Sequence, residues 1–274
     1  MISINKIAII GAGNIGTSLA RGLSTTPSFR KEEIYLTRRS LDKLKAFTEE
    51  GFQVTSDNSV AVRNSSIIIL CVEPHQSPAV LKEISRELDP QKHVLISVVS
   101  GLEIDQIKKH IDTDINIIRA MPNIAIVMGE SMTCLAAQNT NNEYLTMAQD
   151  IFNTVGETLV IEEEQMAGAT SLGACGIAFF LRAIRAASQG GIEIGFHAED
   201  ALKIAANTAK GAASLLTHSG THPEAEIDKV TTPMGCTISG LNQMEHDGFS
   251  SAMIKGIKVS ADKAAGLYKS EKNK

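Results

Sequence analysis

The sequence predicts an α/β fold for residues 1–163 and an all-α fold for residues 164–274. In the first region, short apolar β-branched runs alternate with amphipathic segments of helical period, which is typical of a doubly wound, mostly parallel sheet. In the second region such runs are absent, and Ala, Gly and Leu dominate. The acidic cluster at residues 162–164 separates the two patterns, and we therefore place the domain boundary there.

Six runs in the first region are predicted to be strands because they are short and rich in β-branched residues. Several are apolar on both faces, as parallel strands covered by helices on both sides must be. Helical segments are predicted at residues 14–22, 40–50, 77–88 and 103–111. The predicted strands are, in order, Lys6–Ile10, Glu33–Thr37, Ile67–Val72, His93–Val98, Ile115–Arg119 and Ser131–Ala136.

The second region is predicted to form long helices at residues 165–191, 198–219 and from 239 onward. Their many small residues permit close approach of neighbouring helices. A helical region of this composition often buries its apolar face against a second copy of itself, so we expect a homodimer that forms through this region.

The composition argues against several classes of function. Of 274 residues, 26 are basic and 31 acidic, which gives a formal charge of −5 and no broad surface for nucleic acid. Aromatic residues make up 4% and Trp is absent, so a base-stacking platform is not expected. The longest weakly polar stretch, residues 166–181, is shorter than the ~20 residues of a bilayer span. We find no signal peptide and expect a cytoplasmic protein without nucleic-acid or membrane partners.

The cysteines and histidines indicate no metal site. The four cysteines form no C-x-x-C pair, so we expect reduced thiols rather than disulfides or a zinc site. His218 and His222 have the spacing of metal ligands on a helix. A glycine between them and a proline after them would interrupt that helix, and no third ligand is evident.

A glycine-rich hexamer follows the first predicted strand and opens the first predicted helix. In this context G-x-G-x-x-G is typical of a Rossmann-type dinucleotide-binding domain. The first glycine permits the tight turn, the second lets the backbone approach a pyrophosphate, and the third allows close helix–strand packing. The helix N-terminus supplies free N–H groups to the anion. The residues are Gly11, Ala12, Gly13, Asn14, Ile15 and Gly16, preceded by Ile10.

The end of the second predicted strand favours NADPH over NADH. An NAD-specific site usually places Asp or Glu there, to accept a hydrogen bond from the ribose 2′-hydroxyl. This chain instead has Arg38 and Arg39, whose guanidinium groups suit a 2′-phosphate. We therefore predict NADPH as the cofactor, with NADH as a poorer substitute.

Beyond these motifs, segments along nearly the whole chain resemble Δ1-pyrroline-5-carboxylate reductase. The most specific is the stretch Asp228–Leu241, which is preceded by Ser219–Pro223. Further matching segments, in order along the chain, are Asp57-Asn58, Cys71–Pro74, Ser97–Gly101 and Arg119–Asn123.

The resemblance implies reduction of the cyclic imine pyrroline-5-carboxylate to L-proline with NAD(P)H, the last step of proline biosynthesis. It also implies a C-terminal domain that dimerises, with further assembly into a decamer. The substrate-binding positions that it implies are Glu163, Lys229, Thr232, Gly235, Cys236 and Thr237. Besides the glycine-rich hexamer with Ile10 and the two arginines, the implied cofactor-binding positions are Asn58, Cys71, Val72, Glu73, Pro74, Val99, Ser100, Gly101, Met121, Pro122 and Asn123.

The chemistry asked of such a site is modest. A protonated C=N group already accepts hydride well, so the protein mainly has to orient it against the nicotinamide. A glycine-containing turn before a helix offers N–H groups to the substrate carboxylate, a role that we assign to Pro233–Thr237. Thr237 is the predicted catalytic residue, since its hydroxyl can hydrogen-bond the ring nitrogen as imine becomes amine. Helix N-capping is the alternative role for this threonine.

Three departures from the family pattern stand out. Residues 174–179 read Ala-Cys-Gly-Ile-Ala-Phe instead of Gly-Ser-Gly-Pro-Ala-Tyr, and Ile177 restores an N–H, which predicts a more regular helix. Met234 replaces a glycine, at a cost of ~1 kcal/mol if that position needs φ > 0. Glu73 stands where lysine is usual.

These departures leave two alternatives open: a reductase of a related cyclic imine, and a non-catalytic NADPH-binding relative that regulates. A β-hydroxyacid dehydrogenase would need a lysine early in the long interdomain helix, and residues 165–191 contain none.

Overall fold

The computed structural model describes residues 6–138 and 142–266. The chain divides into two compact units, Met1–Cys175 with Ser260–Lys274, and Gly176–Val259. The predicted domain boundary, between residues 163 and 164, lies twelve residues before the boundary between the two units, which falls between residues 175 and 176. The intervening turns stay with the first unit, where Met166, Thr170 and Ser171 are buried.

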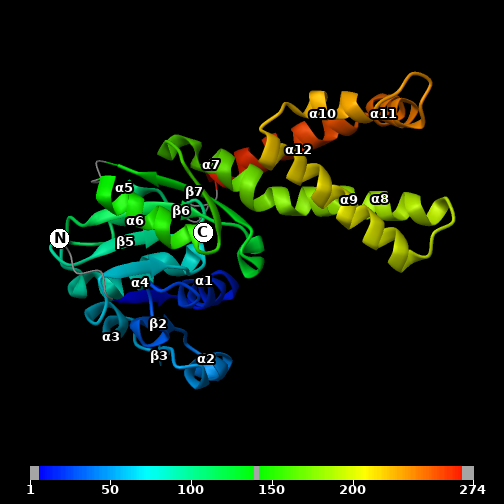
Figure 1. Cartoon of the computed structure of the whole chain (residues 1–274). Coiled ribbons are helices and arrows are strands. Elements are labelled where there is room, and N and C mark those ends of the chain that lie inside the picture. The colour runs from blue at the N-terminus through cyan, green and yellow to red at the C-terminus, as the bar shows by residue number, and fades with distance from the viewer. Residues whose placement is uncertain (1–5, 139–141, 267–274) are drawn as a thin grey trace. The chain divides into compact units, whose positions relative to one another are not determined.

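The first unit contains an eight-stranded sheet in the order β3-β2-β1-β4-β5-β6-β7-β8 (Figure 1). Neighbouring strands are parallel except for β6 and β7, which are antiparallel. The strands are β1 (Ile7–Ile10), β2 (Ile34–Thr37), β3 (Gln53–Thr55), β4 (Ile67–Leu70), β5 (Val94–Ser97), β6 (Asn116–Met121), β7 (Ser131–Ala137) and β8 (Gly156–Val160).

Each of the six predicted strands is present. Their burial explains the apolar, β-branched sequences from which they were predicted. All residues of β1, β4 and β5 are buried. None of the predicted runs falls at β3 or β8. The first has three residues, none of them buried, and the second lies at the sheet edge with Leu159 exposed. Neither strand carries the continuous apolar pattern of a covered parallel strand.

Helices cover both faces of the sheet, and each face has its own core. Ile7 and Ile9 pack with α1, α2 and α6, whereas Ala8 and Ile10 pack with α3, α4 and α5. This alternation along β1 is the side-chain period of a strand, and it makes the unit doubly wound as predicted. The helices of this unit are α1 (Asn14–Ser24), α2 (Lys45–Glu49), α3 (Asn58–Arg63), α4 (Ser77–Ile84), α5 (Ile104–Lys108), α6 (Asn142–Asn153) and α7 (Met166–Ala169).

Short 3₁₀ turns join several of these elements, and a π-helix follows α7. The 3₁₀ turns are η1 (Lys31–Glu33), η2 (Leu41–Leu44), η3 (Pro74–Gln76), η4 (Ser85–Glu87), η5 (Ile124–Met128) and η6 (Glu163–Gln165); the π-helix is η7 (Thr170–Cys175). The expected regular helix therefore begins only at Gly176, and the preceding turns are wider than an α-helix.

The second unit is helical, as predicted, and encloses little core of its own. Its helices α8 and α9 pack against each other, with Gly191 close to Ala201. In this unit only Gly176, Ser188 and Ala201 are buried. The helices are α8 (Gly176–Glu193), α9 (Ala198–Ser219), α10 (Pro223–Val230), α11 (Cys236–His246) and α12 (Phe249–Gly266), the last of which ends in the first unit.

Large apolar side chains are therefore exposed along this unit, among them Phe180, Leu181, Ile204, Leu215 and Ile254. The helical run Glu163–Glu193 is long and apolar enough to cross a membrane by length and composition. The predicted absence of a membrane span rested on the length of residues 166–181 alone, and that length argument does not hold for the longer helical run.

Candidate active site

The glycine-rich hexamer forms the turn between β1 and α1. Gly11 has φ +94°, and a Cβ there would lie 2.7 Å from Val72 Cγ1 and 2.8 Å from the Cys71 carbonyl oxygen. A Cβ on Gly16 would lie 2.9 Å from the Gly11 oxygen, whereas one on Gly13 would meet nothing within 4 Å. Gly11 thus forms the tight turn, Gly16 packs closely against the strand, and Gly13 leaves open space beside the backbone, as predicted.

The N-terminus of α1 can receive an anion. Its N-cap is Gly13, which supplies no side-chain hydrogen bond to the first turn. The first amides of the helix are therefore left for a ligand or solvent, and the helix dipole favours negative charge there.

This turn lies where the strand order reverses, since β1 is flanked by β2 and β4. Hydrogen bonds tie the carboxyl ends of the three strands together. The Ala12 amide donates to the Thr37 carbonyl at 2.8 Å, and the Cys71 amide donates to the Ile10 carbonyl at 2.8 Å. Open α/β sheets bind ligands at this switch point, so the residues fit a dinucleotide.

The two arginines follow β2 beside the turn. Arg38 Nη1 donates to the Ala12 carbonyl at 2.9 Å, and the Arg38 amide donates to the Thr55 carbonyl at 3.3 Å. Arg39 is exposed. A cation is thus held against the glycine-rich turn, and its role toward a dinucleotide stays a prediction.

Four further predicted cofactor positions follow β4. Burial raises the pKa of the Cys71 thiol to about 12, which disfavours a thiolate at this position. Glu73 is exposed and pairs with His75 at 3.4 Å, while Pro74 opens η3. Val72 is the side chain that excludes a Cβ from Gly11.

The remaining predicted cofactor positions lie on other loops of the first unit. Asn58 begins α3, and its Nδ2 donates to Glu83 Oε2 at 3.1 Å. Val99, Ser100 and Gly101 form the loop after β5, in which Gly101 has φ +75°.

The predicted cofactor positions at the end of β6 are buried and contact other parts of the protein. Met121, Pro122 and Asn123 are buried. Asn123 Oδ1 accepts from the Ala125 amide at 3.0 Å, and its Nδ2 donates to the Gly173 carbonyl at 3.2 Å. The Asn123 side chain thus caps η5, and its role toward a cofactor stays a prediction.

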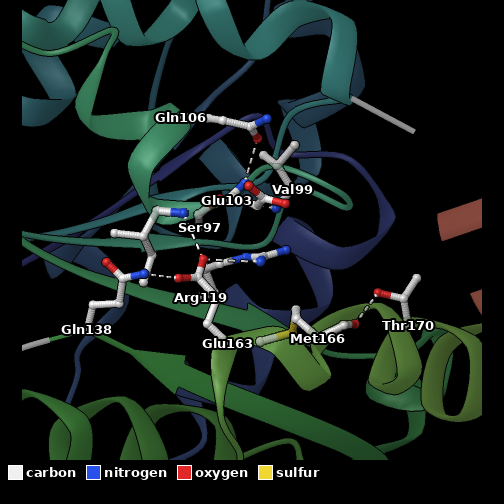
Figure 2. A network of polar contacts seen from close by, with 10 residues as sticks. Ser97, Val99, Glu103, Gln106, Arg119, Gln138, Glu163, Met166 and Thr170 are labelled. Atoms are coloured by element: carbon white, nitrogen blue, oxygen red, sulfur yellow. Dashed lines mark hydrogen bonds and ion pairs between the residues drawn. The ribbon is translucent and has the colours of Figure 1, made fainter. Parts of the chain in front are cut away.

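A polar network, in which the Arg119 side chain is buried and Gln138 is exposed, surrounds Glu163 (Figure 2). Its carboxylate accepts from the Ile104 amide at 2.8 Å, from Arg119 Nη1 at 3.3 Å and from Gln138 Nε2 at 2.5 Å. The Arg119 side chain is 6% exposed, and burial lowers its pKa, an effect that Glu163 opposes. A cavity of about 340 Å³ adjoins the network and is lined by Gly101, Glu103, Asp105 and Glu164 among others.

Neither Arg119 nor Gln138 was predicted to have a role in the site. The available signal was an arginine within a buried, apolar strand, because such a charge needs a partner. The partner itself could not be read from the sequence, since Glu163 lies 44 residues away.

The predicted substrate loop lies in the second unit and forms a tight turn before α11. The Gly235 amide donates to the Thr232 carbonyl at 2.9 Å, with Pro233 and Met234 between them. Met234 has φ +61°, so this position does require the left-handed conformation. Proline followed by a residue of positive φ is the pattern of a type II turn.

Thr237 is the second residue of α11 and does not cap it. The N-cap is Gly235, without a side-chain hydrogen bond. Among the described residues, the structure shows no hydrogen-bond partner for the Thr237 hydroxyl. Lys229 donates to Glu226 Oε1 at 2.6 Å, and this bond holds the pKa of the Glu226 carboxyl below its usual range.

Met234→Gly is expected to raise the free energy of unfolding, because Met234 is fully exposed and its backbone is strained. Met234→Ala is the matched control, since it removes the same side chain but keeps the strained Cβ. We expect the glycine variant to be about 1 kcal/mol more stable than the alanine variant in denaturant titrations. Equal stabilities would show that this backbone is unstrained.

The structure thus gathers the predicted cofactor residues in the first unit and all predicted substrate residues except Glu163 in the second. Within the described residues, no group of three or more His, Cys, Asp or Glu side chains could hold a metal ion.

Two family models match the chain. The model for pyrroline-5-carboxylate reductase dimerisation matches residues 163–267, and that for coenzyme F420-dependent NADP oxidoreductases matches residues 6–101.

Relatives match over nearly the whole chain. Pyrroline-5-carboxylate reductase 2 of Dictyostelium discoideum is 48% identical, over 95% of this chain and 92% of that protein. Pyrroline-5-carboxylate reductase 1 of the same organism is 52% identical over 96% of this chain, which spans only half (50%) of that protein's length. The crystal structure of Plasmodium falciparum pyrroline carboxylate reductase with NADP bound has a TM-score of 0.87 at 24% identity, covering 98% of this chain and 100% of that one. At this identity the likeness shows the fold.

Proposed function

The chain belongs to the pyrroline-5-carboxylate reductase family, and on this premise we propose that it reduces 1-pyrroline-5-carboxylate to L-proline with NADPH. This reaction is the last step of proline biosynthesis. The observation that carries the proposal is the 48% identity to a reductase of which the chain covers 92%. The glycine-rich turn at the switch point supports the use of a dinucleotide.

The first unit supplies the residues for the cofactor. The amides at the start of α1 would hold the pyrophosphate, and Arg38 and Arg39 would hold the 2′-phosphate. When bound, NADPH supplies a hydride to the carbon of the C=N bond. The loops at residues 71–74, 99–101 and 121–123 complete the proposed cofactor site.

The second unit supplies the residues for the imine. The amides of Cys236 and Thr237 at the start of α11, together with Lys229, would bind the substrate carboxylate. The turn from Thr232 to Gly235 sets the start of this helix. The Thr237 hydroxyl would hydrogen-bond the ring nitrogen, which keeps its proton while the adjacent carbon accepts the hydride.

The assembly proposed with this activity is a homodimer through residues 164–274, and ten copies in the full oligomer. The exposed apolar side chains of α8, α9 and α12 support it, because a single unit leaves them in water. We propose the cytoplasm as the compartment.

The test is NADPH oxidation by the purified protein with DL-pyrroline-5-carboxylate as substrate. We expect turnover with formation of L-proline. NADPH binding without turnover would overturn the proposal, and assays with other cyclic imines would then separate a reductase of a related imine from a non-catalytic, regulatory relative.

A further inference from the structure

Among the described residues that line the cavity beside Glu163, Arg119 is the one cation. Four carboxylates share that lining, those of Glu103, Asp105, Glu163 and Glu164. Burial lowers the pKa of Arg119, and the carboxylates of Glu163 and Glu103 both oppose this effect. A single guanidinium therefore balances the charge of a strongly acidic lining.

This guanidinium meets Glu163 at one carboxylate oxygen. Arg119 Nη1 donates to Oε1 at 3.3 Å, and the Ile104 amide donates to the same oxygen at 2.8 Å. The two side chains are 6% and 11% exposed, respectively. Arg119 lies inside the sheet, opposite Ser97 of β5 and Ala136 of β7. Oε1 is thus held between a buried cation and the backbone of α5.

The second oxygen of Glu163 keeps room for a ligand. Oε2 accepts from Gln138 Nε2 at 2.5 Å, and Gln138 approaches the carboxylate from a different side than Arg119 (Figure 2). Gln138 is exposed, and both Gln138 and Glu163 line the cavity. Because a carboxylate oxygen has two lone pairs, Oε2 can accept a further hydrogen bond there.

We propose that Arg119 is a positioning residue for the imine substrate: it fixes Oε1 of Glu163 and keeps the carboxylate ionised, so that Oε2 can bind the positive end of the imine. The inference rests on the proposed function, in which Glu163 is a substrate contact. A protonated C=N group is positively charged, and a carboxylate is a fitting partner for it. Neighbouring carboxylates disfavour the ionised form of Glu163, and the cation of Arg119 favours it.

The charge of the imine determines which kinetic constant responds. Its ring nitrogen is positive when the imine binds, and it loses that charge as the adjacent carbon accepts the hydride. An ionised Glu163 therefore stabilises the bound imine more than the transition state. Loss of that interaction should raise KM for the imine more than it lowers kcat.

Arg119→Met removes the charge and keeps a long side chain. We expect the KM for the imine, measured at saturating NADPH, to rise at least about tenfold, while kcat stays within about threefold. Arg119→Lys keeps the charge and should recover part of the loss. The dissociation constant of NADPH, measured by fluorescence, should stay within about twofold, which a disrupted sheet would not allow. Arg86→Met is the matched control, because this exposed arginine has no ion pair among the described residues, and it should leave all three constants unchanged.

A double-variant cycle decides whether Arg119 acts through Glu163. Glu163→Gln removes the negative charge but keeps an oxygen for the Ile104 amide, and it should also raise the KM for the imine. Adding Arg119→Met to Glu163→Gln should change that KM by less than about twofold, because the interaction is already lost. The double variant contains no lone buried charge, so this comparison remains available if Arg119→Met alone does not fold.

Independent, multiplicative effects of the two substitutions would overturn the inference, as would an unchanged KM for the imine in Arg119→Met. Loss of NADPH binding in Arg119→Met would show a structural role instead. Turnover by the native protein is measured first. Its absence would overturn the proposed function and this inference together, whereas an active native protein with independent effects would overturn the inference alone.

Discussion

Replacing Arg38 and Arg39 together by alanine is expected to raise the KM for NADPH about 10–100-fold and to leave the KM for NADH within about twofold. The range corresponds to the loss of one or two charge-assisted hydrogen bonds to a phosphate. Steady-state kinetics with both cofactors, at a fixed saturating imine concentration, measures both constants.

The geometry explains why the effect should be selective. Arg38 is fixed by its bond to the Ala12 carbonyl, so its guanidinium is held at the turn before any cofactor binds. In the proposed site the amides at the start of α1 would bind the pyrophosphate that NADH and NADPH share, so the arginines would serve only the 2′-phosphate. The Thr37 hydroxyl already accepts from the Gly11 amide at 3.2 Å, so the turn keeps support after the substitutions.

Arg63→Ala is the control, since Arg63 forms an exposed ion pair with Glu87 on the same unit. It should leave both KM values unchanged. An equal rise for NADH and NADPH in the double variant would contradict the selective role and would mean that Arg38 acts through the turn alone.

The core of the fold was predictable because strands that are covered on both faces have continuous apolar sequences. The runs at β1 and β4 are apolar on both faces, and the helix predicted at residues 198–219 has the bounds of α9. The short strand β3 and the π-helix η7 were not predicted. The strand β3 is stabilised by its pairing with β2, which its own residues do not reveal. The π-helix η7 differs from the neighbouring α-helices by about one residue per turn, and the hydrophobic pattern of six residues is too short to show that difference.

The candidate site was predictable where one residue needs a special backbone. Gly11 and Met234 both show the positive φ that their motifs require. The network around Glu163 was not predictable, because its partners come from segments far apart in the sequence and meet only after the sheet forms. A motif marks a residue but does not tell whether its side chain meets a ligand or another part of the protein.

Thr237→Ala is expected to lower kcat/KM for the imine about 5–150-fold, which corresponds to about 1–3 kcal/mol of transition-state binding. The hydroxyl is free of hydrogen bonds within the described part of the protein, at the second position of α11, so the protein does not use it for structure. The change should therefore cost little stability. Thermal unfolding, measured beside the kinetics, separates the two effects.

The matched variants decide what the hydroxyl does. Thr237→Ser keeps the oxygen and should retain activity within a few-fold, whereas a requirement for the methyl group would make it resemble alanine. Ser239→Ala removes another hydroxyl from the same helix, one that bonds the Gly235 carbonyl at 3.3 Å, and should leave kcat/KM unchanged. Because NADPH is proposed to bind through the first unit, its KM should not respond to any of the three variants.

If Thr237→Ala keeps full activity, the ring nitrogen does not depend on this side chain, and the amides at the start of α11 alone must orient the imine.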